Sequence, residues 1–345
     1  MSEIRRIPTK RHRDEYNRWV AFLNTASIRH EDNVDATYGV YEDNRLIATG
    51  SIYRNILKCI AVCKDHTGGP VLNQLISFLM SEVMEQGYTT VYVYTKPESV
   101  VSFKYLGFKE IATVKDLVFL EKAVHGFDEY LNKLKELAHD KPDSSAIVMN
   151  ANPFTKGHQY LIEYASQHSE HVYVFVLSED ISEFPAAVRF NLVKAGTAHL
   201  KNVEIVETGN YMVSSQTFPS YFLKEEADVT YVHASLDASI FRQVAQVMHI
   251  TKRFVGEEPY SQATAIYNQA LSSILNPEIE LEIIPRKEFD HEVISASRVR
   301  QALKINDLET VKKLVPETTL EYLVSDEGQH LVHELRNGGK YHDKV

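Results

Sequence analysis

The stretch Ser145-Ala-Ile-Val-Met-Asn-Ala-Asn-Pro-Phe-Thr-Lys-Gly-His-Gln-Tyr-Leu-Ile162 decides how the second half of this chain folds. Its apolar beginning predicts a short strand, Asn152 and Pro153 predict a tight turn, and a helix is expected to begin near Thr155. Where a strand feeds a helix N-terminus in this way, backbone N–H groups and the helix dipole attract anions. The stretch therefore predicts a binding site for nucleotide phosphates.

The rest of the second half alternates between strand and helix patterns. We expect strands at 146–150, 172–177, 203–206, 229–233, 253–255 and 281–284. We expect helices at 157–168, 186–199, 238–248 and 264–275, followed by three or more helices from residue 297. This alternation predicts an α/β fold with a doubly wound, Rossmann-like parallel sheet. Ligands in such folds bind beyond the carboxyl ends of the strands.

The first half predicts a separate α+β domain. We expect strands at 38–41, 46–53, 57–62, 88–95 and 115–120, and helices at 71–86 and 99–106. Charged residues, Pro142 and paired serines mark a boundary near residues 139–145. The expected domains are therefore 1–125 and 145–345, with a helical linker at 126–144.

Composition excludes several classes of protein. The net charge of -10 over 345 residues argues against broad binding to nucleic acid or to anionic membranes. Cys59 and Cys63 are the only cysteines, so a disulfide framework is not expected, and both fit a reduced core. The N-terminus lacks the apolar segment of a signal peptide, and no apolar run approaches the ~20 residues that span a bilayer. We expect a cytoplasmic protein.

Three sites of the second half suit one reaction, the attack of a nucleophile on the α-phosphate of ATP: residues 155–158, residues 294–300 and Arg189. His158 on the first turn of its helix suits the α-phosphate. Ser295 and Ser297, with Arg298 and Arg300, would hold the β- and γ-phosphates and then the leaving pyrophosphate. Such donors lower the barrier by positioning and electrostatics, without a covalent enzyme intermediate.

The residues expected to act directly in the reaction are His158, Thr155 and Arg300. The residues expected to bind ATP are Asn152, Pro153, Phe154, Lys156, Gly157, Arg189, Gly256, Glu257, Ser295, Ser297 and Arg298. No carboxylate cluster with the spacing of metal ligands stands out. We therefore expect no metal site in the protein, and we expect Mg²⁺ to be carried on the triphosphate.

The two phosphate-binding segments resemble the signatures of the nucleotidyltransferase superfamily. Thr155, Gly157 and His158 match the motif (His or Thr)-x-Gly-His. Ile294, Ser295, Ser297 and Arg300 match Ile-Ser-x-(Ser or Thr)-x-x-Arg. The form of the first motif with threonine is typical of the adenylyltransferase-like branch.

Three longer runs, 149–158, 235–241 and 250–259, resemble the citrate lyase ligase family. That family carries an N-terminal domain similar to GNAT acetyltransferases, and residues 1–125 fit it. The resemblance implies a ligase that uses ATP and acetate to acetylate the thiol of the phosphoribosyl-dephospho-CoA group on the citrate lyase acyl carrier protein. AMP and pyrophosphate would leave, an acetyl-adenylate would be the intermediate, and the acetylation would switch citrate lyase on.

The first domain departs from working acetyltransferases of the GNAT type. Their pyrophosphate-binding loop corresponds to Asp65-His-Thr-Gly-Gly-Pro70, in which an acid repels phosphate and Pro70 removes an N–H donor. Phe103 stands where the family places its general-acid tyrosine, and Tyr105 lies two residues further on. The resemblance thus implies a fold without its usual chemistry, which docks the carrier protein or its prosthetic arm.

The residues alone leave two alternatives to the ligase. An adenylyltransferase acting on a phosphorylated small molecule, such as a pantetheine phosphate, explains the second domain but not residues 1–125. A non-catalytic adaptor would bind the nucleotide without catalysing any reaction of it. Release of pyrophosphate from ATP, tested with acetate and carrier protein or with a phosphorylated acceptor, separates the three.

Overall fold

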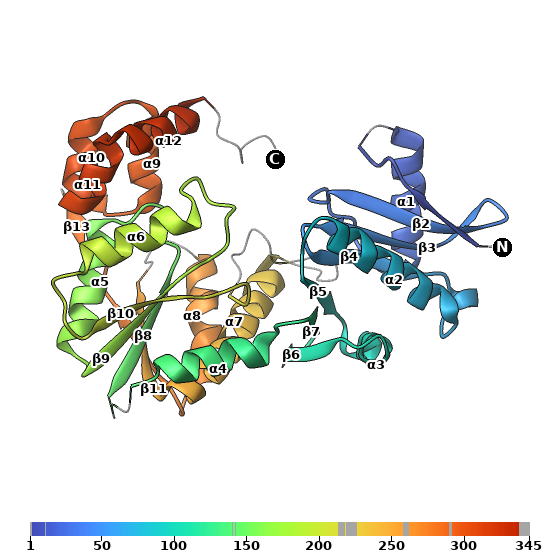
Figure 1. Ribbon diagram of the computed structural model, residues 1–345, viewed down its shortest axis with the longest axis horizontal. Helices are drawn as coiled ribbons and strands as arrows, with labels where there is room; N and C mark the ends of the chain where they lie inside the picture. The colour runs from blue at the N-terminus through green and yellow to red at the C-terminus, as the bar shows by residue number, and fades with distance from the viewer. Residues whose placement is uncertain are drawn as a thin grey trace. The chain divides into compact units, whose positions relative to one another are not determined.

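The chain forms two compact units in the computed structural model (Figure 1), which describes residues 2–10, 12–139, 141, 143–212, 218, 226–257, 262–289 and 292–337. The first unit comprises the described residues of Met1–Tyr130 and Thr217–Leu236. The second comprises the described residues of Leu131–Gln216 and Asp237–Val345. The domain limits drawn from the sequence remain a prediction.

The first unit is built on a seven-stranded sheet with the order β1-β2-β3-β4-β5-β7-β6. Its strands are β1 (Glu3–Arg6), β2 (Ala36–Glu42), β3 (Arg45–Tyr53), β4 (Ile56–Val62), β5 (Thr90–Thr95), β6 (Lys109–Val114) and β7 (Leu117–Ala123). Its helices include α1 (Arg13–Thr25), α2 (Pro70–Glu85) and α3 (Val100–Tyr105). The sequence did not predict β1, α1 or β6. Helix α2 buries one apolar face, which includes Leu75, Leu79 and Val83.

Strands β4 and β5 separate after a short pairing. They run parallel, and their register contains only the pairs Ile56↔Tyr92 and Leu57↔Val93 among the described residues. Beyond these pairs lies a cavity of about 300 Å³, lined in part by Val62 and Tyr94. Backbone groups that do not pair within a sheet are available to a ligand.

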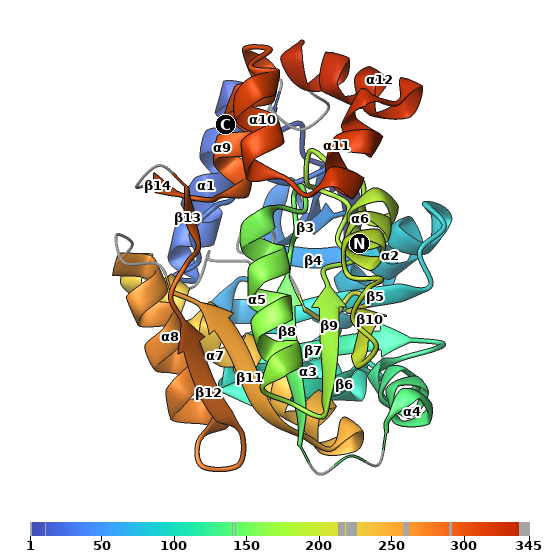
Figure 2. The same cartoon turned by 90° about the vertical axis from the view of Figure 1, so that its left-hand side faces the viewer.

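The second unit contains a five-stranded parallel sheet with the order β10-β9-β8-β11-β12. Its strands are β8 (Ser144–Met149), β9 (His171–Val176), β10 (Val203–Glu207), β11 (Ile250–Gly256) and β12 (Glu280–Ile284). Helices α5 (Lys156–Gln167) and α6 (Ala186–Gly196) cover one face, and α8 (Gln262–Leu275) with the end of α7 (Glu226–Met248) covers the other (Figure 1). In Figure 2, α5 lies over the sheet between β9 and β11. The predicted fold class, a doubly wound parallel sheet preceded by an α+β part, is confirmed.

The strand expected at 229–233 is wrong, because these residues belong to helix α7. Their β-branched and aromatic side chains favour a strand locally. In the helix, however, Val232, Leu236 and Ile240 recur at intervals of four residues and are all buried. Tertiary packing of this face outweighs the local preference.

Four helices and a short antiparallel pair complete the second unit. Strands β13 (Glu288–Phe289) and β14 (Glu292–Val293) precede α9 (Ala296–Lys304), which α10 (Leu308–Leu314), α11 (Glu317–Val324) and α12 (Asp326–Arg336) follow. Their shared core contains Val299, Leu303, Val311 and Leu323. Figure 2 shows these helices beyond the carboxyl ends of the parallel strands. Among the described residues, no helix has the length and apolar character needed to cross a membrane.

Candidate active site

A cavity of about 240 Å³ lies at the carboxyl ends of β8, β11 and β12. Its lining includes the end of β8, the first turn of α5, the residues that follow β12 and the first turn of α9. This is where a doubly wound parallel sheet places its ligands. The cavity therefore stands where the sequence predicted the nucleotide.

Thr155 and His158 form a reciprocal cap at the N-terminus of α5. The hydroxyl of Thr155 accepts a hydrogen bond from the backbone N–H of His158 at 3.3 Å. In return, Nδ1 of His158 accepts one from the backbone N–H of Thr155 at 3.1 Å. Because Nδ1 accepts, the neutral imidazole carries its proton on Nε2 and can donate from there to a ligand oxygen.

The imidazole of His158 stays neutral over the ordinary range of pH. Burial, and to a smaller extent the positive charge of Arg286, lowers the pKa of His158 from 6.5 to about 4. The ring also stacks on Phe154, with centroids 5.9 Å apart and planes 13° apart. His158 is thus a fixed neutral donor at the cavity, with no cationic charge of its own.

The first turns of α5 and α9 approach each other beside the cavity. Ser295 caps α9 by accepting a hydrogen bond from the backbone N–H of Arg298 at 3.2 Å. A Cβ placed on Gly157 would lie 3.1 Å from the carbonyl oxygen of Ile294. Two helix N-termini therefore present their N–H groups and partial positive charge to one cavity.

Arg300 holds the loop that precedes α5. Its Nη1 donates to the carbonyl oxygen of Asn152 at 2.6 Å, and its Nε lies 3.1 Å from a carboxylate oxygen of Glu183. Nδ2 of Asn152 donates to the other oxygen of Glu183 at 2.6 Å, and its Oδ1 accepts from the backbone N–H of Phe184 at 3.0 Å. Arg300 and His158 thus contact the same loop, but Arg300 does not line the cavity.

Arg189 lies beneath this loop, fully buried. Its guanidinium donates to the backbone carbonyls of Phe184, Asn150, Leu177 and Glu179 at 2.6–2.9 Å. These bonds leave it directed into the protein, which differs from the expectation that it binds ATP. Its position makes it a support for the loops that follow β8 and β9.

Lys156 also points away from the cavity. Its Nζ donates to the carbonyl oxygens of Lys312 and Lys313, at 3.1 and 3.0 Å, at the C-terminal end of α10. A cation suits the negative end of a helix. Lys156 therefore joins the first turn of α5 to the C-terminal helices.

The expected site residues fall into two groups. The members that line the cavity are Thr155, Gly157, His158, Gly256 and Ser295. The members that do not are Asn152, Pro153, Phe154, Lys156, Arg189, Glu257, Ser297, Arg298 and Arg300. Asn152, Pro153 and Phe154 are buried and shape the turn, whereas Glu257 and Ser297 are exposed.

Two basic residues that line the cavity, Arg286 and Lys287, were not predicted from the sequence. Nε of Arg286 donates to the carbonyl oxygen of Glu257 at 2.7 Å, which fixes the guanidinium beside the end of β11. Nζ of Lys287 lies 5.5 Å from the centroid of the Tyr160 ring. Both follow the carboxyl end of β12, and this position could have identified them.

The cavity of the first unit differs in its lining residues from the cavity of the second unit. Phe103 is buried there and packs edge-to-face on Phe108, with centroids 5.7 Å apart. Tyr105 has 87% of its surface exposed and does not line the cavity. His66, Thr67 and Gly68 line it from the loop before α2.

Comparison with known proteins identifies relatives over most of the chain. Residues 144–323 match the family model described as the citrate lyase ligase C-terminal domain. The chain is 37% identical over 310 residues to the [citrate [pro-3S]-lyase] ligase of Escherichia coli (strain K12), covering 88% of each chain. It is 34% identical over 315 residues to the protein of that name from Haemophilus influenzae, covering 88% of this chain and 93% of the relative.

A similar relative is known from Klebsiella pneumoniae, also named [citrate [pro-3S]-lyase] ligase, with 34% identity over 310 residues. It covers 88% of this chain and 91% of the relative. Among solved structures, the ribosomal-protein-S18-alanine N-acetyltransferase from Escherichia coli matches 36% of this chain and 94% of its own. That match has 13% identity and a TM-score of 0.30.

Proposed function

The chain belongs to the citrate lyase ligase family, and we propose that its second unit activates acetate with ATP. The acetyl group passes to the thiol of the prosthetic group on the citrate lyase acyl carrier protein, which activates citrate lyase. One observation carries the proposal: the cavity joins two helix N-termini, a neutral histidine and two basic side chains. This set suits a polyphosphate. Family membership favours the ligase over an adenylyltransferase of small molecules and over a non-catalytic adaptor.

In the first step, a carboxylate oxygen of acetate attacks the α-phosphorus of ATP. The bond from that phosphorus to the oxygen bridging the α- and β-phosphates breaks, so pyrophosphate leaves and acetyl-adenylate remains. Nε2–H of His158 donates to a nonbridging oxygen of the α-phosphate, whose negative charge rises in the transition state. A neutral donor with a fixed tautomer does this without needing a proton from solvent.

Arg286 and Lys287 take the roles that the sequence analysis gave to Arg298 and Arg300. They line the cavity and bring positive charge to the β- and γ-phosphates and then to the leaving pyrophosphate. The backbone N–H groups at the start of α9, next to Ser295, add donors for the same oxygens. Arg300 and Asn152 act indirectly, by holding the loop before α5.

No carboxylate lines this cavity within the described part of the chain. We expect Mg²⁺ to be carried on the triphosphate, whose oxygen atoms are ligands that the ion prefers. In the second step, the carrier thiol loses its proton and attacks the carbonyl carbon of acetyl-adenylate. The bond from that carbon to the phosphate oxygen breaks, which gives the thioester and AMP.

The first unit accepts the prosthetic arm of the carrier in its own cavity. The separated edges of β4 and β5 resemble a place where an extended chain can bind backbone groups. Phe103 has no proton to give, which fits a binding role without acetyl transfer to an amine. In the full-length chain, Ser102→Trp would place a large side chain at the lining of this cavity. It should raise KM for carrier protein and leave acetate-dependent exchange of pyrophosphate into ATP unchanged.

The ligase is tested by measuring pyrophosphate release from ATP across a panel of small acids, with and without deacetylated carrier protein. We expect acetate to support exchange of labelled pyrophosphate into ATP, and net release to require carrier protein as well. If release needs neither acetate nor carrier protein but requires a phosphorylated pantetheine, the adenylyltransferase is supported. No exchange with any acid would support the adaptor.

A further inference from the structure

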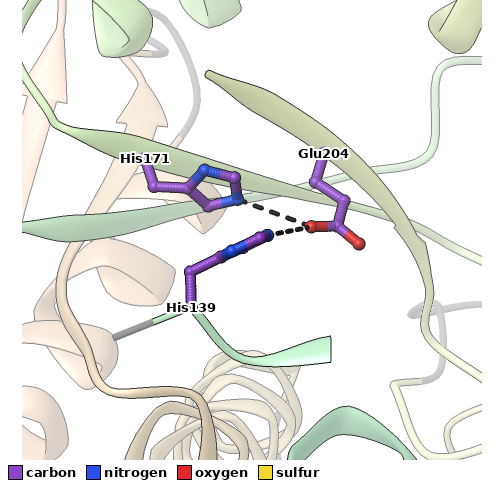
Figure 3. A group of neighbouring side chains, drawn as sticks. All are labelled: His139, His171 and Glu204. Carbon is purple, nitrogen blue, oxygen red and sulfur yellow. Dashed lines mark hydrogen bonds and ion pairs between the residues drawn. The ribbon is translucent and has the colours of Figure 1, made fainter. Parts of the chain in front are cut away.

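Two histidines and a glutamate of the second unit converge at the amino ends of its strands, away from the ATP cavity (Figure 3). His139 follows α4 (Phe127–Leu137), His171 opens β9, and Glu204 lies near the start of β10. Nε2 of His139 is 3.0 Å and Nε2 of His171 is 3.5 Å from the same carboxylate oxygen of Glu204. The three ligand atoms all lie within 4.8 Å of one another.

These separations suit a small tetrahedral metal ion. With zinc bonds to nitrogen and oxygen of about 2.0–2.2 Å, the ligand atoms of a tetrahedron lie about 3.3–3.6 Å apart. The distances of 3.0 and 3.5 Å lie close to this range, and all three separations are within 4.8 Å. Two imidazoles with one carboxylate favour a transition metal such as Zn²⁺ over Mg²⁺ or Ca²⁺, which prefer oxygen ligands alone.

A second observation also calls for a partner at this place. Nε2 of His171 is buried, and its contact with Glu204 at 3.5 Å lacks the geometry of a hydrogen bond. Buried nitrogen atoms without a hydrogen bond are uncommon, and an ion is one of the usual reasons for them. His139 is held in place, because its backbone N–H donates to the hydroxyl of Tyr173 at 2.7 Å and its ring stacks on that of Tyr173.

We propose that His139, His171 and Glu204 bind one divalent transition metal ion, best matched by Zn²⁺. The site lies at the amino ends of β9 and β10, whereas the ATP cavity lies at the carboxyl ends of the strands. The ion would therefore act away from the ATP cavity. It joins the segment after α4 to two strands of the sheet, and three protein ligands leave one position for water.

The test uses the full-length chain without a polyhistidine tag, stripped with a chelator and dialysed. Zn²⁺ is titrated by calorimetry, and Co²⁺ is followed by its visible ligand-field absorption. We expect one ion per chain and a higher unfolding temperature with the ion, because the native state alone binds it. His171→Ala, His139→Gln and Glu204→Gln should each weaken binding more than the roughly 10- to 100-fold typical of losing an outer partner.

His199→Ala is the matched control, because it also removes a histidine that pairs with a glutamate in the second unit. It should bind the ion like the unaltered chain. His139 is half exposed, so His139→Gln keeps the test usable if the other two variants do not fold. The proposal is overturned if the unaltered chain binds no Zn²⁺, or if the folded variants still bind it with the original affinity. None of these measurements depends on ligase activity.

Discussion

Gly157 lies against the carbonyl oxygen of Ile294, so close that an added Cβ would stand 3.1 Å from it. This contact limits how closely the first turns of α5 and α9 approach, and these turns carry the two motifs that predicted phosphate binding. Each turn supplies backbone N–H groups, and the cavity lies between them.

Gly157→Ala should therefore weaken ATP binding by moving these turns apart. We expect KM for ATP to rise several-fold while kcat changes less, in steady-state assays of pyrophosphate exchange. Gly256→Ala is the control on the same cavity, because its Cβ would have no neighbour nearer than Arg286 at 3.9 Å. Equal effects of the two substitutions would show that the spacing of α5 and α9 is unimportant.

His158→Ala should lower kcat by roughly 10²- to 10³-fold, as expected for loss of one preorganised donor to a developing negative charge. His158→Gln keeps an N–H at similar reach and should retain part of the rate. Far-UV circular dichroism checks that both variants fold. If kcat falls by the same factor in both variants while both stay folded, donation from Nε2 is not the role of His158.

Arg286 should influence the titration of His158. Its positive charge helps to lower the pKa of His158 to about 4, so Arg286→Gln should raise that pKa towards 6.5. Proton NMR of the imidazole across pH 3–8 measures it. An unchanged pKa would leave burial as the sole cause. Arg286→Gln should also raise KM for ATP, because the variant brings less positive charge to the triphosphate.

The same pKa gives a dependence of stability on pH. A histidine whose pKa is lower in the folded state than in the unfolded state takes up its proton more readily on unfolding. Between pH 6.5 and about 4, His158 should therefore reduce the free energy of unfolding as the pH falls. Urea unfolding at pH 7 and pH 5 should show a smaller loss for His158→Gln. A loss equal to that of the unaltered chain would contradict the lowered pKa.

Arg300→Ala should weaken the binding of ATP and of AMP by similar factors. Arg300 acts on the site indirectly, through the carbonyl of Asn152 and the carboxylate of Glu183. Isothermal titration with each nucleotide measures both affinities. A loss confined to ATP would restore the direct contact with the β- and γ-phosphates that the sequence motif predicted. Lys156→Ala removes another motif cation directed away from the cavity, and it should likewise weaken binding of ATP and AMP by similar factors.

The sequence predicted the parallel sheet well because alternating strand and helix patterns are local signals. It failed at 229–233, where the buried face of α7 depends on distant contacts. It placed Arg189 on the ligand, because burial beneath a loop is not visible in a motif. It could not join His139, His171 and Glu204, which come from three separate segments.

The two hydrogen bonds from Lys156 to the end of α10 have a mechanical consequence. Lys156 is the first residue of α5, two positions before the imidazole at the cavity. A shift of α10 would move the carbonyl oxygens that this ammonium group holds, and with them the first turn of α5, where we propose that the triphosphate binds. A change in the C-terminal helices would therefore alter the proposed ATP site through this one side chain.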